Sequence, residues 1–193
     1  RANEVERRVK LDKPFYVGRF EVTNGQYRRF QSKHTSQQLG GNSLDFVKQP
    51  VSGITWLDAA KFCNWLSEEA GLDRVYEVEG DRLVSSTIKA NGYRLPTETE
   101  WAWLARIQDD GSRLTYPWGG KSYPPPGKAE NYADQQAKTL LGRAVPNYDD
   151  GFIVAAEVGR LVANQKGLHD MGGNVSEWTH DFYSVQAHRG PPL

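Results

Sequence analysis

The sequence contains a single cysteine, Cys63, among 193 residues. One sulfur can form neither an intrachain disulfide nor a zinc site built from cysteines. Cys63 falls on the apolar side of a predicted helix, where a small buried residue is the favoured interpretation and a reactive thiol is the alternative. The cysteine content therefore excludes a disulfide framework and leaves the redox compartment open.

The chain also lacks an excess of charge of either sign, because 24 Lys and Arg residues balance 24 Asp and Glu residues. No basic run or stripe is present, although a basic surface is what nucleic-acid binding requires. We therefore expect no nucleic acid among the partners of this protein.

Long apolar runs are absent as well. No run approaches the roughly 20 apolar residues that are needed to cross a bilayer. The chain begins with Arg1 and polar residues instead of a signal sequence. These absences predict a soluble chain with no membrane span and no signal peptide, whose compartment is unknown.

Signatures of two common kinds of enzyme site are missing too. No Gly-x-Ser-x-Gly elbow of a serine hydrolase occurs, and no two of the four histidines have the helical i, i+4 spacing of metal ligands. We interpret the histidines as surface or structural residues; they are His34, His169, His180 and His188.

Glycine and large aromatic residues, by contrast, are abundant: the sequence has 19 Gly, 6 Trp and 9 Tyr. Rigid aromatic side chains packed against many tight turns are typical of a compact fold with modest regular secondary structure. The length of the chain favours one domain.

Three capping boxes predict three helix starts. In each, a threonine is followed three residues later by a side chain that can reach back to its backbone N–H; the pairs are Thr23 and Gln26, Thr55 and Asp58, and Thr97 and Glu100. The first helix is expected to bury Tyr27 and Phe30. The second is the most regular, because apolar residues recur at helical spacing over residues 56–70 and Gly71 follows as a C-cap.

Strand signals are weaker. Alternation predicts one or two half-buried strands in residues 9–22, a hairpin with a tight turn in residues 75–84, and a last strand in residues 177–183. Residues 32–43 are predicted to be a polar surface loop. The irregular stretch 116–151 is the kind of long segment that an ion can fix; its candidate ligands are Asn131, Asp149 and Asp150.

Residues 167–178 hold the clearest functional signal. Asp170 and Glu177 supply hard carboxylate oxygens, and the glycine pair 172–173 allows the backbone to fold so that carbonyl oxygens converge beside them. A calcium loop is built in this way, and a glycine-rich turn with a tryptophan behind it is the alternative. Residues 174–176 also match the Asn-x-Ser glycosylation acceptor, which we interpret as coincidence because a tight ion loop is a poor substrate.

Several motifs together resemble one family, the formylglycine-generating enzyme or sulfatase-modifying-factor family. They follow that family's order over nearly the whole chain: Phe20-Glu21-Val22-Thr23-Asn24, Pro50-Val51 with Trp56, Tyr93-Arg94-Leu95-Pro96-Thr97-Glu98, Tyr116-Pro117-Trp118-Gly119, Ala129-Glu130-Asn131 and Gly173-Asn174-Val175-Ser176-Glu177-Trp178. The resemblance implies one irregular α+β domain of the C-type-lectin-like kind over residues 1–193. It also implies that up to two structural calcium ions, rather than an extensive sheet, hold the domain together.

The resemblance further implies the ligands of both ions. Each ion would be held by two side chains and two backbone carbonyls. For the first ion these belong to Asn131, Asp150, Tyr132 and Phe152, and for the second to Asp170, Glu177, Gly173 and Val175. Family members often have Asn where this chain has Asp170, and a carboxylate there would strengthen the binding of a divalent cation.

One departure from the family matters for function. In the family's enzymes a copper-binding pair of cysteines lies beyond the Gly-Asn-x-x-Glu-Trp motif, whereas this sequence stops at Leu193 with only Cys63. The domain is therefore expected to lack that C-terminal segment, and copper could be a cofactor only if the segment supplies the cysteines. No catalytic residue is assigned. Two classes of function remain: a calcium-stabilised module that binds a protein, a peptide or another ligand, and the main body of a copper-dependent formylglycine-generating or related oxidase.

Overall fold

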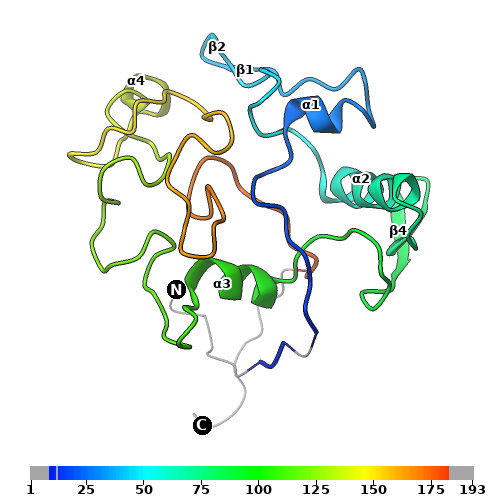
Figure 1. The fold of residues 1–193 in the computed structure, drawn as a ribbon. Helices are drawn as coiled ribbons and strands as arrows, with labels where there is room; N and C mark the ends of the chain where they lie inside the picture. The colour runs from blue at the N-terminus through cyan, green and yellow to red at the C-terminus, as the bar shows by residue number, and fades with distance from the viewer. Residues whose placement is uncertain (1–8, 12, 183–193) are drawn as a thin grey trace, which may run out of the picture.

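The computed structural model describes residues 9–11 and 13–182. In this part the fold is mixed α+β, with short helices and strands joined by long irregular segments (Figure 1). The elements, in chain order, are α1 (Asn24–Tyr27), β1 (Gln38–Leu39), β2 (Asn42–Ser43), α2 (Trp56–Glu69), β3 (Tyr76–Glu79), β4 (Arg82–Ser86), α3 (Glu98–Arg106) and α4 (Lys138–Leu141). The strands pair as two antiparallel hairpins, β1 with β2 and β3 with β4. None of the described helices has the length and apolar character of a membrane span.

All three predicted capping boxes form. At the start of α3, Thr97 Oγ1 accepts the backbone N–H of Glu100 at 3.1 Å, and a Glu100 carboxylate oxygen accepts that of Thr97 at 2.8 Å. The same reciprocal pair begins α1 at Thr23 and α2 at Thr55. Gly71 follows the end of α2 with a φ of 67°, in the left-handed region that suits a C-cap glycine. The predicted extent of α2 is thereby confirmed.

Two buried clusters connect these elements. One lies between α2 and the β3–β4 hairpin and consists of Ala60, Cys63, Val75 and Tyr76. The buried Asn64 fixes this contact, because its Nδ2 donates to Tyr76 O at 2.6 Å and its Oδ1 accepts from the backbone N–H of Val75. The other cluster packs α3 against the segment that follows Gly167; its members are Leu104, Ala105, Leu168 and Met171.

Residues 177–181 are held against the N-terminal ends of α2 and α3. At α2, Trp56 Nε1 donates to Thr179 O at 2.7 Å. At α3, Asp181 accepts the backbone N–H of Glu98 at 2.6 Å, one of the groups that a helix start leaves without an internal partner. The end of the predicted calcium loop is therefore anchored on two helices.

The strand predictions are wrong at both ends of the chain. The described part of residues 9–22 contains no strand and runs along the surface, up the centre of the view, towards α1 (blue in Figure 1). Several of its apolar side chains, including Tyr16 and Val17, are exposed. Phe15 packs against α3, and the ring centroids of Phe20 and His169 lie 4.9 Å apart. Residues 177–182 contain no strand either, because their backbone and side chains bond to an indole and to a helix start. Tyr183 lies outside the described residues.

The predictions for the hairpin and for the long irregular stretch are confirmed, and one predicted loop contains a short hairpin. Residues 75–84 form the predicted hairpin, and the stretch 116–151 is irregular apart from the single turn of α4. Residues 32–43, predicted to be a loop, contain the small β1–β2 hairpin, which turns at Gly40 and Gly41. Phe30 lies beyond the end of α1, because that helix is a single turn.

Candidate cation site at residues 167–178

Residues 167–178 form an irregular loop that packs directly on residues 130–131. A Cβ on Gly173 would lie 2.3 Å from Asn131 O, and a Cβ on Gly172 would lie 3.0 Å from a Glu130 carboxylate oxygen. Neither glycine has a positive φ, so the pair serves close approach rather than a tight turn, and the backbone contact makes glycine necessary at position 173. This corrects the predicted role of the glycine pair.

Asn174 joins the loop to three other parts of the chain. Its backbone lies in the left-handed region with a φ of 66°, which asparagine tolerates better than most residues. Its Oδ1 accepts from Asn131 Nδ2 at 3.0 Å and from Ala156 N at 2.7 Å. Its Nδ2 donates to a Glu21 carboxylate oxygen at 2.8 Å. The amide nitrogen that a glycan would occupy is therefore already bonded within the fold.

Four carboxylates act on one another around this loop. Asp170 and Glu177 belong to it, and their negative charges raise the pKa of both Glu21 and Glu130. Glu130 is 3% exposed and Asp170 is 2% exposed. One oxygen on each of Glu21, Glu130 and Asp170 is buried without a hydrogen-bond partner. A buried acceptor without a partner is costly, so three in one place require a physical explanation.

The raised pKa values of the four carboxyl groups indicate that their simultaneous ionisation without a cation is unfavourable. Burial first, and then the charge of Asp170, raises the pKa of Glu21 to about 8. Burial raises the pKa of Glu130 to about 7, although a hydrogen bond from the backbone of Gly172 opposes the change. Burial also raises the pKa of Asp170 and of Glu177. A positive charge among these groups would allow all of them to ionise at neutral pH.

Glu177 as a whole is an exposed residue. Its carboxylate nevertheless points towards α3, where it accepts the indole N–H of Trp101. One oxygen of Asp170 accepts the backbone N–H of Gly159 at 3.3 Å, and the other oxygen has no partner. The residues expected to hold the second ion thus lie in one loop with their carboxylates sharing an electrostatic environment.

A hard cation fits this set of donors. Calcium takes about six to eight oxygen ligands and prefers carboxylates and backbone carbonyls. Oxygens without a hydrogen bond are the ones that can turn to a cation without losing a partner. Within the described residues, no three His, Cys, Asp or Glu side chains already converge closely enough to hold an ion. Side chains would therefore have to close onto the cation as it binds.

The residues expected to hold the first ion are organised by hydrogen bonds. Asp150 is completely buried, and its two oxygens accept the backbone N–H groups of Tyr132 and Phe152, both at 2.9 Å. Burial raises the pKa of Asp150 to about 6, against the effect of those two donors. Asn131 lies beside them and donates to Val154 O at 2.9 Å. The hydrogen bonds alone account for this arrangement, and a calcium ion there stays a prediction.

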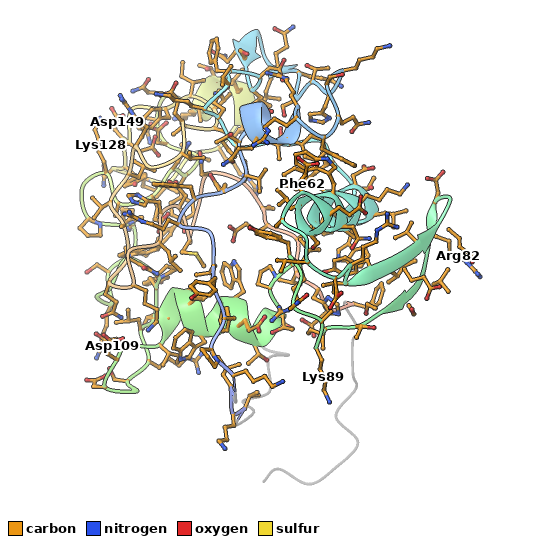
Figure 2. All side chains as sticks on the ribbon, turned by 45° about the vertical axis from the view of Figure 1, so that its right-hand side comes forward. Phe62, Arg82, Lys89, Asp109, Lys128 and Asp149 are labelled. Carbon is orange, nitrogen blue, oxygen red and sulfur yellow. The ribbon has the colours of Figure 1, made fainter. Side chains whose placement is uncertain are left out.

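Asp149, the third candidate ligand of the stretch 116–151, faces outward. It accepts from Gln136 Nε2 and from the backbone N–H of Gly151, both at 3.0 Å, and it lies at the edge of the molecule near Lys128 (Figure 2). A buried acid of this region that the sequence motifs did not indicate is Asp134, which accepts the backbone N–H of Asp150 at 3.0 Å.

Each described histidine has a hydrogen-bonding partner within the fold. His34 lies 3.1 Å from Ser52 O through its Nε2, and His169 lies 2.8 Å from Leu161 O through its Nδ1. His180 Nδ1 lies 3.1 Å from the Tyr76 hydroxyl. These contacts are structural, as the sequence analysis interpreted them, and His188 lies outside the described residues.

Cys63 is buried in the cluster between α2 and the hairpin. Burial raises the pKa of its thiol to about 12. At neutral pH the side chain is therefore a protonated core residue, which is unsuited to bind copper as a thiolate.

Comparison with known proteins identifies the family of this chain. Residues 2–190 match the family model for the sulfatase-modifying factor enzyme 1-like domain. Similar proteins include the chaperone protein LppX of Paenibacillus barcinonensis, 30% identical over 88% of this chain and 63% of its own length. Two proteins of Mus musculus are also similar. The formylglycine-generating enzyme is 32% identical over 93% of this chain and 52% of its own length. The inactive C-alpha-formylglycine-generating enzyme 2 is 30% identical over 89% of this chain and 59% of its own length.

The fold is similar to that of CarF, with a TM-score of 0.62 and 26% identity over 88% of this chain and 69% of CarF. The chain spans about half to two thirds of the length of the relatives above. The family model covers nearly all of its residues, in agreement with the motifs of the sequence. The chain belongs to the formylglycine-generating enzyme or sulfatase-modifying-factor family.

Proposed function

We propose that this chain is a calcium-stabilised module that binds a protein or peptide ligand. The observation that carries the proposal is that Glu177 belongs both to the candidate cation site and to the lining of an adjacent groove. A cation held by Asp170 and Glu177 would fix the loop that forms one wall of this groove. Calcium suits such a role because it is a hard, redox-inert ion bound by oxygen.

The groove has the character of a peptide-binding surface. Its volume is about 540 Å³, within the range of ligand sites in proteins. Apolar residues of α2, β4 and the segment after Glu177 line it, together with acidic ones: Trp56, Leu57, Leu83, Trp178, Phe182, Asp81, Glu177 and Asp181. Trp178 is 49% exposed and Phe182 is 77% exposed. A short peptide with apolar and basic side chains would complement this surface in shape and charge.

Chelation tests the calcium part of the proposal. We expect a chelator to lower the melting temperature, because an ion that binds only the folded state stabilises it. Glu177→Ala should reproduce part of this loss in calcium buffer. An unchanged melting temperature, with metal analysis showing that the bound ion had been removed, would contradict a stabilising role for calcium.

A displayed random-peptide library tests the binding part. Peptides selected on the calcium-loaded chain should be rich in apolar and basic residues and should lose binding to Phe182→Ala. The matched control is Phe46→Ala, because Phe46 is also exposed, at 62%, and does not line the groove. Equal binding to both variants, or selection of no peptides, would count against the groove as a binding surface.

The alternative function is the main body of a copper-dependent formylglycine-generating oxidase whose cysteine segment lies beyond Leu193. The identity of 32% to the formylglycine-generating enzyme of Mus musculus favours it, while the single buried cysteine of this chain does not. An assay of the parent protein, with any cysteine segment that follows Leu193 included, separates the two functions; it uses a cysteine-containing sulfatase peptide, copper and a reductant and is read by capture of the aldehyde. Turnover above a copper-only control would replace the binding proposal by the oxidase.

A further inference from the structure

Glu21 and Glu130 are acidic residues that the predicted ligand sets do not include, yet both lie at the candidate cation site. We propose that they complete it, so that one calcium-type cation is bound by four carboxylates from three segments of the chain: Glu21, Glu130, and Asp170 with Glu177. The inference rests on the cation binding described under the proposed function and adds the residues that set the charge of the site.

The environment of Glu130 is the first argument. The residue is 3% exposed, and one of its carboxylate oxygens has no hydrogen-bond partner. The charged groups that act on it most strongly are Asp170 and Glu177, both acidic. A buried carboxylate in acidic surroundings is strongly disfavoured unless it is protonated or a cation is present.

Glu21 shows the same pattern from the opposite end of the chain. One oxygen accepts from Asn174 Nδ2 at 2.8 Å, and the other is buried without a partner. Asp170 and Glu177 are again the charges that act on it. Asn174 thus holds Glu21 against the loop, while the oxygen without a partner remains available to a cation.

The chemistry of the four groups selects the kind of ion. Carboxylates are hard oxygen donors, and a site with several of them favours a hard divalent cation of calcium type over softer metals. Their combined negative charge should also give high affinity for a trivalent lanthanide of similar size. Closure onto the ion would break no hydrogen bond of the oxygens on Glu21, Glu130 and Asp170 that have no partner.

Terbium luminescence and calcium titration test the inference on the whole chain. Trp101 donates to Glu177, so excitation of this indole should sensitise terbium bound at the site. We expect Glu130→Gln and Glu21→Gln each to weaken calcium and terbium binding by about tenfold or more, since the number of charged ligands sets the affinity of calcium sites. Glu79→Gln is the matched control, because Glu79 is exposed at the end of β3.

Melting temperatures separate a ligand role from a merely structural one. In chelator, each glutamine variant should melt at or above the temperature of the wild type, because it removes a buried carboxyl group whose charged form the neighbouring acids disfavour. In calcium, each variant should melt below the wild type. Variants that are less stable in chelator, or that fail to fold, would overturn the inference.

The outcomes also distinguish the two proposals. If the wild type binds calcium and both glutamine variants bind it equally well, the inference about Glu21 and Glu130 is wrong and the proposed function stands. If the wild type binds neither calcium nor terbium, both proposals are rejected.

Discussion

The pair Arg94 and Glu100 offers a sharp test of what stabilises the start of α3. Arg94 Nη1 and Nη2 each lie 2.7 Å from a different Glu100 oxygen, so the contact is bidentate. Glu100 also accepts the backbone N–H of Thr97 at 2.8 Å. Glu100 is 7% exposed, and the Arg94 side chain is 18% exposed. Glu100→Ala would therefore leave a largely buried guanidinium without its partner.

The size of the effect follows from this geometry. Removing one member of a buried pair costs about 3–5 kcal/mol, and the partial exposure of Arg94 places Glu100→Ala at the lower end, at about 3 kcal/mol. For a domain of this size that corresponds to a fall of roughly 6 to 12 °C in melting temperature. Urea and thermal unfolding of the wild type and the variant measure both quantities.

Glu98→Ala is the matched control for Glu100→Ala. Glu98 occupies the same first turn of α3 and is exposed, so its loss removes a similar interaction with the helix dipole but no buried ion pair. The reasoning would be refuted if Glu100→Ala and Glu98→Ala destabilised the chain to the same extent.

The pH dependence supplies a second check. Burial raises the pKa of Glu100, but hydrogen bonds from Arg94 and from the backbone of Thr97 outweigh it, so its pKa in the folded state is lowered. A carboxyl whose folded pKa is lowered stabilises the fold fully above its unfolded pKa of about 4.3. The difference between wild type and Glu100→Ala should therefore be constant near neutral pH and shrink as the pH falls through the folded pKa.

Three further predictions follow from local geometry. Thr97→Ala should lower the free energy of unfolding by about 1 kcal/mol, because it leaves one N–H at the start of α3 without its acceptor; an unfolding curve that overlays the wild type would contradict the cap. Gly173→Ala should separate the loop from Asn131 O, which the new Cβ would meet at 2.3 Å, and should reduce terbium luminescence; unchanged luminescence would show that the close approach is not needed. Cys63 should react with a thiol reagent at pH 8 only after denaturant is added, because burial raises its pKa to about 12; rapid labelling of the native chain would contradict a core role.

Local sequence patterns predicted the helices well because the relevant contacts span only a few residues. A capping box joins positions three apart, and the three boxes and the extent of α2 could be identified without knowledge of the rest of the fold. The strand prediction for residues 9–22 failed because alternating apolar residues do not by themselves supply a neighbouring strand, and Tyr16 and Val17 remain exposed here. The ring of Phe20 lies next to the loop residues His169 and Gly159 instead.

The candidate site was predictable only in part for the same reason. Asp170 and Glu177 belong to one short loop, so their spacing was visible in the sequence. Glu21 lies 153 residues before Asn174, its hydrogen-bond partner, and no local pattern could pair them. The glycine pair was noticed, but the reason for it, close contact with residues 130–131, depends on tertiary packing.

The bond between Glu21 and Asn174 has a consequence for synthesis of the chain on the ribosome. Chains grow at about 5–20 residues per second, so an interval of roughly 8 to 30 s separates the appearance of these two residues, which are 153 positions apart. During that interval Phe20 and Glu21 have neither His169 nor Asn174 to pack against. This early segment therefore packs only after residues 169–174 have been synthesised, and the nascent chain must keep it accessible until then.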